Sequence, residues 1–350
     1  MTAIGSKLPF YPHSYEFSVE ETSAILISRS IEVLREIASD NIRRMKGYKA
    51  NVQLLDRGIF YPNDYYTALK ETHQQKRLDF FLQKGSFWHC YTPTSHFEMV
   101  PTPIDECYPT GFLKCCFVLK KGAQPTEALV SLREKISLLG CGETCQISYY
   151  EAIRKVLGDD KFNKLFAADS PTPLKIGQSR LLNNPIASLM MACPTKSKIV
   201  KGQINQITNT PLYKNKHIHG HGSTFITLCC DDTPGKELFT TLGLSPEGLT
   251  YAQVNEALMA EFNKDSIGTA TVTDVVAKCI LEGEPEEMLE QASELKNKKI
   301  SSLAEFTELN GGGIILQGEL VAKRITLLAN STFEEARLLL DTWVKEFVAH

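Results

Sequence analysis

The spacing of apolar residues changes along this chain, and that change is the strongest constraint on its fold. Between residues 18 and 45, apolar side chains recur at helical intervals, and Ser18 with Glu21 has the pattern of a capping box at a helix start. Residues 86–120 instead alternate and contain many β-forming residues, in runs such as "GFLKCCFVLKK". The sequence therefore predicts an α+β fold in which helices cover sheets.

The rest of the chain repeats this mixture. Helical patterns cover 124–140 and 142–157, strand patterns return at 200–230, and a helix is predicted at 245–265. Residues 270–350 have a mostly helical pattern, broken by "NGGG". We expect three regions, which are an N-terminal helical extension at 1–85, a mixed core at 86–244 and a helical C-terminal region at 245–350.

Composition excludes several classes of function. With 350 residues and a net charge of −3, the chain can bury a large core, and nothing in it attracts nucleic acid or an anionic membrane. No segment approaches the roughly 18 apolar residues of a membrane span. The first residues lack the pattern of a secretory signal, so we expect a cytoplasmic protein or one delivered into another cell without a cleavable signal. Its ten cysteines include no CxxC pair, which favours reduced thiols.

Two cysteines lie at the start of the helix predicted at 142–157. Cys141 directly follows Gly140, and Cys145 lies four residues later on the same helix face. The partial positive charge of a helix N-terminus can lower a cysteine pKa from about 8.5, and its free N–H groups can stabilise an oxyanion. We predict Cys141 as a nucleophile. Cys145 is the competitor, because a helix beginning at Thr144 would place Cys145 at its tip.

Three histidines at alternate positions, His217, His219 and His221, could share one face of a strand. They could supply a catalytic base, bind a metal or form a polar strand edge. No HExxH pattern or acidic ligand motif accompanies them, so we expect no metal. The order of a helix-start cysteine and a histidine on a later strand is that of papain-like thiol enzymes. We predict His221 as the base, because it leads directly into the apolar strand, with His219 second.

A catalytic imidazole needs a third group that holds its tautomer. The sequence alone does not identify this third residue. Candidate orienting or auxiliary residues are Glu143, Cys145, Thr240 and Asp231, with Asn205, Gln206 and Thr241 as further alternatives. Glu143 could equally be a complement to the helix dipole, and Asp231 follows the strand at its opposite end. No cofactor is predicted.

The region from 125 to 166 resembles the bacterial spore-coat transglutaminases. The resemblance is carried by "PTEALVSLREKISLLG", by the spacing from Cys141 to "YYEAI" and by "GDDKFNKLF". It implies a papain-like, transglutaminase-like core, in which a nucleophile helix packs on a small antiparallel sheet, with additional helices at both ends. The family's glutamate before its cysteine is Gly140 here, and its downstream His-Gly is Thr240–Thr241. Its second catalytic glutamate matches the histidine cluster.

These features together predict a thiol enzyme that forms an acyl-thioester at Cys141 with a histidine base. The resemblance implies a protein substrate that presents a glutamine carboxamide, which would be deamidated or transferred to an amine. Alternatives are a papain-like cysteine peptidase or amidase, and a catalytically silent interaction module on the same scaffold. The oligomeric state stays open.

Overall fold

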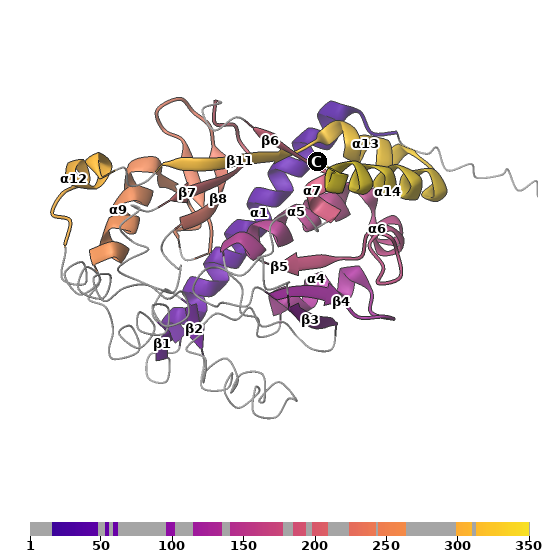
Figure 1. The fold of residues 1–350 in the computed structure, drawn as a ribbon, viewed down its shortest axis with the longest axis horizontal. Coiled ribbons are helices and arrows are strands. Elements are labelled where there is room, and N and C mark those ends of the chain that lie inside the picture. Colours follow the sequence, from indigo (N-terminus) through magenta and orange to yellow (C-terminus); the bar gives the residue numbers. More distant parts are fainter. Residues whose placement is uncertain are drawn as a thin grey trace, which may run out of the picture.

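The structure is a computed structural model, and it describes twelve stretches of the chain. They are residues 16–47, 53–55, 59–61, 96–101, 115–134, 141–177, 185–193, 198–208, 224–242, 244–263, 299–309 and 313–349. The helices are α1 (Val19–Gly47), α4 (Pro125–Glu134), α5 (Cys141–Leu157), α6 (Asp159–Leu165), α7 (Pro185–Ser188), α9 (Tyr251–Asn263), α12 (Leu303–Glu308), α13 (Ala322–Asn330) and α14 (Phe333–Ala349). Figure 1 shows their arrangement.

The strands of the described residues pair antiparallel throughout. They are β1 (Gln53–Leu55), β2 (Ile59–Tyr61), β3 (Phe97–Pro101), β4 (Cys115–Leu119), β5 (Lys175–Gly177), β6 (Met190–Cys193), β7 (Ile204–Thr208), β8 (Thr224–Asp231), β9 (Leu238–Thr240), β10 (Leu249–Thr250) and β11 (Ile314–Leu320). The largest sheet has the order β10-β9-β8-β7-β11-β6, a second has the order β3-β4-β5, and β1 pairs with β2. The predicted α+β class is therefore confirmed.

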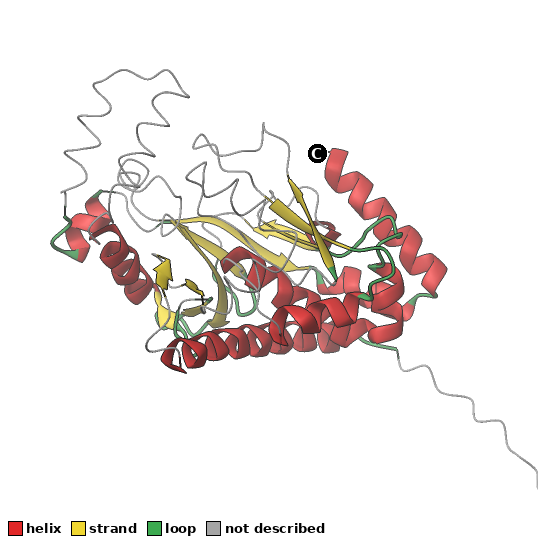
Figure 2. Ribbon diagram, turned by 90° about the horizontal axis from the view of Figure 1, so that it is seen from below, coloured by secondary structure: helices red, strands yellow, loops and turns green. Residues whose placement is uncertain are grey.

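Helix α1 forms where the sequence predicted it. The Ser18 hydroxyl accepts a hydrogen bond from the Glu21 N–H at 3.1 Å, and the Glu21 carboxylate accepts one from the Ser18 N–H at 2.9 Å. This reciprocal pair satisfies N–H groups that a helix start leaves open. Figure 2 shows α1 running along one side of the molecule, where it packs against α5. The N-terminal helix thus belongs to the layer that covers the site-bearing helix.

Strand β8 has one hydrophobic core on each face. Leu228 and Cys230 pack into the core that includes side chains of α1 and α5. Cys229, between them in sequence, points the other way into a second core that contains Val254 of α9 and Phe306 of α12. Because side chains alternate along a strand, burial on both faces explains the continuous apolar run of this strand. It also fixes the register of β8 against the helices.

The C-terminal region departs from its predicted helical pattern. Strand β11 pairs with β7 on one side and β6 on the other, directly after the "NGGG" segment. Gln317 on this strand is buried, and its amide donates hydrogen bonds to the side-chain oxygens of Gln203 at 3.2 Å and Asn205 at 3.0 Å. The helix predicted at 245–265 begins later, at Tyr251.

The packing does not separate the three predicted regions. The core around α5 contains Leu34 from the N-terminal region and Ile325 and Leu340 from the C-terminal region. The division into regions at 1–85, 86–244 and 245–350 stays a prediction. In the folded chain, residues of all three share one core.

Gln146 of α5 connects this helix to the smaller sheet. Its amide donates a hydrogen bond to the Gly177 carbonyl at 3.0 Å and accepts one from the Gly177 N–H at 3.2 Å. Both residues are buried, so no water replaces these bonds when the side chain is lost.

We predict that Gln146→Ala lowers the free energy of unfolding by about 1–3 kcal/mol, because it leaves buried backbone groups without these partners. Urea denaturation followed by circular dichroism measures the change. Glu256→Ala, at an exposed position of α9, is the control and should shift stability by less than about 0.5 kcal/mol. Equal effects of the two substitutions would contradict the role of Gln146.

Candidate active site

Cys141 is the first residue of α5, and its thiol lies against the backbone of β8. The Ile226 N–H donates a hydrogen bond to the Cys141 sulfur at 3.3 Å. One turn later, the Cys145 thiol donates to the Ile226 carbonyl at 3.6 Å. Both cysteines predicted from the sequence therefore reach the same residue of β8. Cys141 is half-buried, whereas Cys145 is fully buried.

Gly142 allows this close approach of helix and strand. A Cβ atom at this position would lie 3.0 Å from Cδ1 of Ile226, which is closer than ordinary van der Waals contact. A residue without a side chain thus lets the start of α5 rest on β8. The Thr144 hydroxyl donates to the Cys141 carbonyl at 2.9 Å and supports the first turn. The N–H groups at the start of a helix point along its axis, in the direction from which an oxyanion could be stabilised.

The pKa of Cys141 moves in the opposite direction from that expected of a helix-start cysteine. Burial of the sulfur raises the pKa to about 11, the Ile226 N–H partly offsets this shift, and the nearby Glu143 adds to it. The residues around Cys141 reveal the helix N-terminus, but they do not reveal the desolvation of the sulfur by the distant strand β8. A thiol with this pKa is protonated at neutral pH, so its use as a nucleophile requires a proton acceptor.

Cys145 is the poorer nucleophile of the two. Burial raises the pKa of its thiol well above the ordinary value, the neighbouring Cys141 raises it further, and the nearby Thr241 hydroxyl lowers it in part. No part of its side chain reaches the surface. Cys141 is only half-buried, whereas a substrate carbonyl could not reach the buried Cys145 without displacing β8.

The candidate auxiliary residues lie at different distances from Cys141. Glu143 is buried in the first turn of α5, close enough to both thiols to raise the pKa of each. Thr240 uses its hydroxyl to donate to the Ser245 carbonyl at 2.8 Å, which holds the turn after β9. Thr241 lies beside Cys145. Of these residues, Glu143 is the one the structure brings to Cys141.

Asp231 lies at the far end of β8 from the site. Five residues separate it from Ile226, which is about 16 Å along an extended strand. Its carboxylate accepts hydrogen bonds from the Thr233 N–H at 2.9 Å and the Thr233 hydroxyl at 2.7 Å. These bonds lower the pKa of Asp231 and explain its position as part of a turn. The structure does not bring Asp231 to Cys141.

His219 and His221 lie outside the described residues, as does the third histidine of the cluster. The described chain resumes at Thr224, three positions after His221, and Ile226 follows two residues later. Within the part of the chain that the structure describes, no group of three or more histidine, cysteine and acidic side chains could hold a metal ion. No helix of that part is long and apolar enough to cross a membrane.

Sequence reasoning missed the strand side of this site. Nothing in the sequence marks the Ile226 N–H as the group that would bind the Cys141 sulfur, because a backbone donor has no residue signature. Gly142 is the one available signal, since a glycine directly after a helix-start cysteine indicates close backbone approach.

Comparison with known proteins gives one structural likeness. No protein-family model matches the chain, and no curated protein matches it. Among solved structures, a transglutaminase from Geobacillus stearothermophilus, without its C-terminal extension, aligns with 90% of this chain and 98% of its own, at 10% sequence identity and a TM-score of 0.48. This likeness concerns the overall course of the chain. The geometry of the site rests on the residues described above.

We predict that alkylation of Cys141 by iodoacetamide is slow at pH 7 and accelerates about tenfold per pH unit up to pH 10, because only the thiolate reacts and its fraction rises in this way below the pKa. Peptide mapping by mass spectrometry measures the rate at each cysteine separately. The exposed fraction of Cys193 is comparable, so this residue serves as the control for reagent access. A Cys141 rate that stays constant between pH 7 and 9 would contradict the raised pKa.

Proposed function

We propose that this protein is a thiol acyltransferase or hydrolase that acts on glutamine side chains of proteins, with Cys141 as the nucleophile. The observation that carries the proposal is the position of Cys141 as the first residue of α5, with its sulfur 3.3 Å from the Ile226 N–H and the first turn of the helix beside it. A thiol beside such donors has what carboxamide chemistry requires, which is a nucleophile and a place for the oxyanion.

The reaction begins when a base removes the proton from the Cys141 thiol. The thiolate then attacks the carboxamide carbon, and the C–N bond breaks as ammonia leaves with the proton supplied by the base. The product is an acyl-thioester at Cys141. Water converts this thioester to glutamate, which is deamidation, and a primary amine converts it to an amide, which is transglutamination.

We propose His221 as the base, with His219 as the alternative. A neutral imidazole has a pKa near 6.5 and can accept a proton at physiological pH. Ile226, which contacts the nucleophile, is only five residues after His221, a distance along the chain that lets an imidazole reach the thiol. The resemblance to spore-coat transglutaminases at 125–166 agrees with Cys141, and the papain-like core is part of this proposal. Because the family's glutamate is Gly140 here, we expect hydrolysis to compete well with transfer.

One observation favours a second candidate, a catalytically silent interaction module. The Cys141 sulfur is covered by β8, and its burial raises the pKa to about 11. A thiol in this state is inert unless a base activates it. In either case, we propose a protein as the partner.

We predict that Cys141→Ala abolishes activity while the fold is retained, because alanine suits a helix start. Cys145→Ala should retain most activity, and His221→Ala should lose most of it. The assay is mass spectrometry of glutamine-containing proteins with and without a primary amine. A gain of about one mass unit indicates deamidation, and a gain equal to the mass of the amine less that of the released ammonia indicates transfer, according to which nucleophile resolves the thioester.

Loss of activity in Cys145→Ala with full activity in Cys141→Ala would reverse the assignment of the nucleophile. Absence of activity in the wild-type protein across a broad panel of substrates would favour the silent module. Circular dichroism of each variant distinguishes lost chemistry from lost structure.

We predict that protein purified without added metal contains no stoichiometric zinc, since the histidine cluster has no cysteine or acidic ligand motif beside it in the sequence. Elemental analysis by mass spectrometry measures the metal content. One zinc ion per chain that disappears in His219→Ala or His221→Ala would overturn the assignment of these residues as a base.

A further inference from the structure

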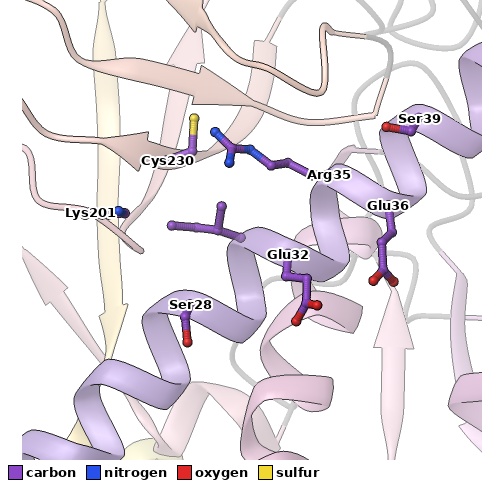
Figure 3. Close-up of a pocket in the computed structure, with 8 residues that line it drawn as sticks. Ser28, Glu32, Arg35, Glu36, Ser39, Lys201 and Cys230 are labelled. Atoms are coloured by element: carbon purple, nitrogen blue, oxygen red, sulfur yellow. The ribbon is translucent and has the colours of Figure 1, made fainter.

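A pocket of about 590 Å³ lies between α1 and the end of β8 that is remote from Cys141. Figure 3 shows this pocket with Arg35 reaching from α1 toward Cys230 of β8, and with Lys201 on the same side of the helix. Five other residues of α1 also line it, which are Ser28, Ile31, Glu32, Glu36 and Ser39. Its size is that of a small-molecule site.

The two cations of the pocket, Arg35 and Lys201, form no ion pair with Glu32 or Glu36 in its wall. Among the residues that the structure describes, no acidic side chain forms an ion pair with Arg35 or Lys201, and Arg35 Nε is buried without a hydrogen-bond partner. A buried guanidinium N–H that lacks an acceptor is costly. An oxyanion that bound there would supply the missing acceptor.

The acidic residues at the pocket already have partners of their own. Glu32 pairs with Arg29 at 2.7 Å, and Glu36 pairs with Arg133. Figure 3 shows both carboxylates directed away from the Arg35 guanidinium. They leave the positive charge of Arg35 available to a ligand.

Two further groups face the cations. The Asp231 carboxylate is close enough to Lys201 and Arg35 for an electrostatic interaction with both. Hydrogen bonds from Thr233 hold this carboxylate in place. The Cys230 thiol contacts the Arg35 guanidinium. Burial raises the pKa of this thiol and Arg35 partly offsets the rise, so the thiol adds no negative charge at neutral pH.

Glycines fix the walls of the pocket. Gly202 directly follows Lys201 and has a φ of +85°. It lies so close to α1 that a Cβ atom on Gly202 would be 2.9 Å from the Ile27 side chain. Gly248, with φ of +97°, leaves only 2.8 Å between a Cβ atom and the Cys230 sulfur. Both backbone conformations favour glycine, so the positions of Lys201 and Cys230 are set by the fold.

We propose that this pocket binds a small organic oxyanion, with a phosphate or carboxylate group held by Arg35 and Lys201. The planar guanidinium can offer Nε and one terminal nitrogen to two oxygens at once, a geometry that suits both groups. Lys201 adds a compact positive charge at the edge of the pocket. The apolar part of the wall, which includes Ile31, would contact the rest of the ligand.

This site is separate from the proposed nucleophile. Cys230 lies four residues beyond Ile226 on β8, which is about 13 Å along the strand. A ligand in the pocket therefore leaves the Cys141 thiol uncovered. The proposal does not depend on enzymatic activity, and its test measures binding alone.

Isothermal titration calorimetry of the full chain with sodium pyrophosphate and with sodium citrate, at matched ionic strength, tests the proposal. We expect one saturable site per chain for at least one of these anions. Affinity should fall about tenfold or more in Arg35→Met and in Lys201→Met, because each removes a charge-assisted contact. Arg35→Lys should restore binding only in part, since lysine lacks the planar fork. Binding of pyrophosphate alone indicates a phosphate-bearing ligand, and binding of citrate alone indicates a carboxylate.

Lys323→Met, at an exposed position on α13, is the matched control and should bind as the wild type does. Thermal unfolding checks that each variant is folded. Should Arg35→Met fail to fold, the exposed Lys201→Met decides the outcome. Absence of saturable binding for both anions, or equal affinity in wild type and Lys201→Met, would overturn the proposal.

Discussion

The contact between the first turn of α5 and Ile226 of β8 is the constraint on which the candidate site depends. It holds the Cys141 sulfur on a backbone N–H, places the Cys145 thiol at the carbonyl of the same residue and leaves little room for a side chain at position 142. Helix α1 packs along α5, and the two helices share one hydrophobic core. This packing stabilises the position of α5 against the sheet. The site is therefore a product of packing between segments far apart in sequence, and the chemistry of Cys141 follows from how closely they approach.

Buried polar groups explain why the sheet includes a strand from the C-terminal region. Gln317 of β11 and Asn205 of β7 lie opposite each other in the register, and their amides bond to each other and to Gln203. The Tyr149 hydroxyl of α5 donates to the Gly202 carbonyl at 2.7 Å. Because an unpaired buried amide is costly, β11 has few other positions in which Gln317 is satisfied. These hydrogen bonds between buried side chains thus favour the observed order of the strands, which burial of apolar side chains alone would not determine.

The sequence predicted the elements whose signals are local. The capping box of α1 and the limits of α5 between Gly140 and Gly158 follow from side chains and glycines within a few residues. Strand β11 was missed because its pairing depends on buried glutamine contacts with residues distant in sequence. The direction of the Cys141 pKa shift was missed for the same reason, since desolvation is created by a strand about 80 residues away. The histidine base stays a prediction, outside the described residues.

The charge of Glu143 gives the raised pKa of Cys141 a role in the proposed chemistry. Burial is the largest cause of the raised pKa of Cys141 and the nearby Glu143 adds to it, so both disfavour a lone thiolate. The same carboxylate would favour a thiolate that is formed together with an imidazolium, because the cation is attracted to both negative groups. Proton transfer from Cys141 to a histidine would therefore be more favourable than loss of that proton to water. A thiol with these neighbours stays protonated until a base is in place, which protects it from unspecific modification and makes its reactivity depend on assembly of the whole site.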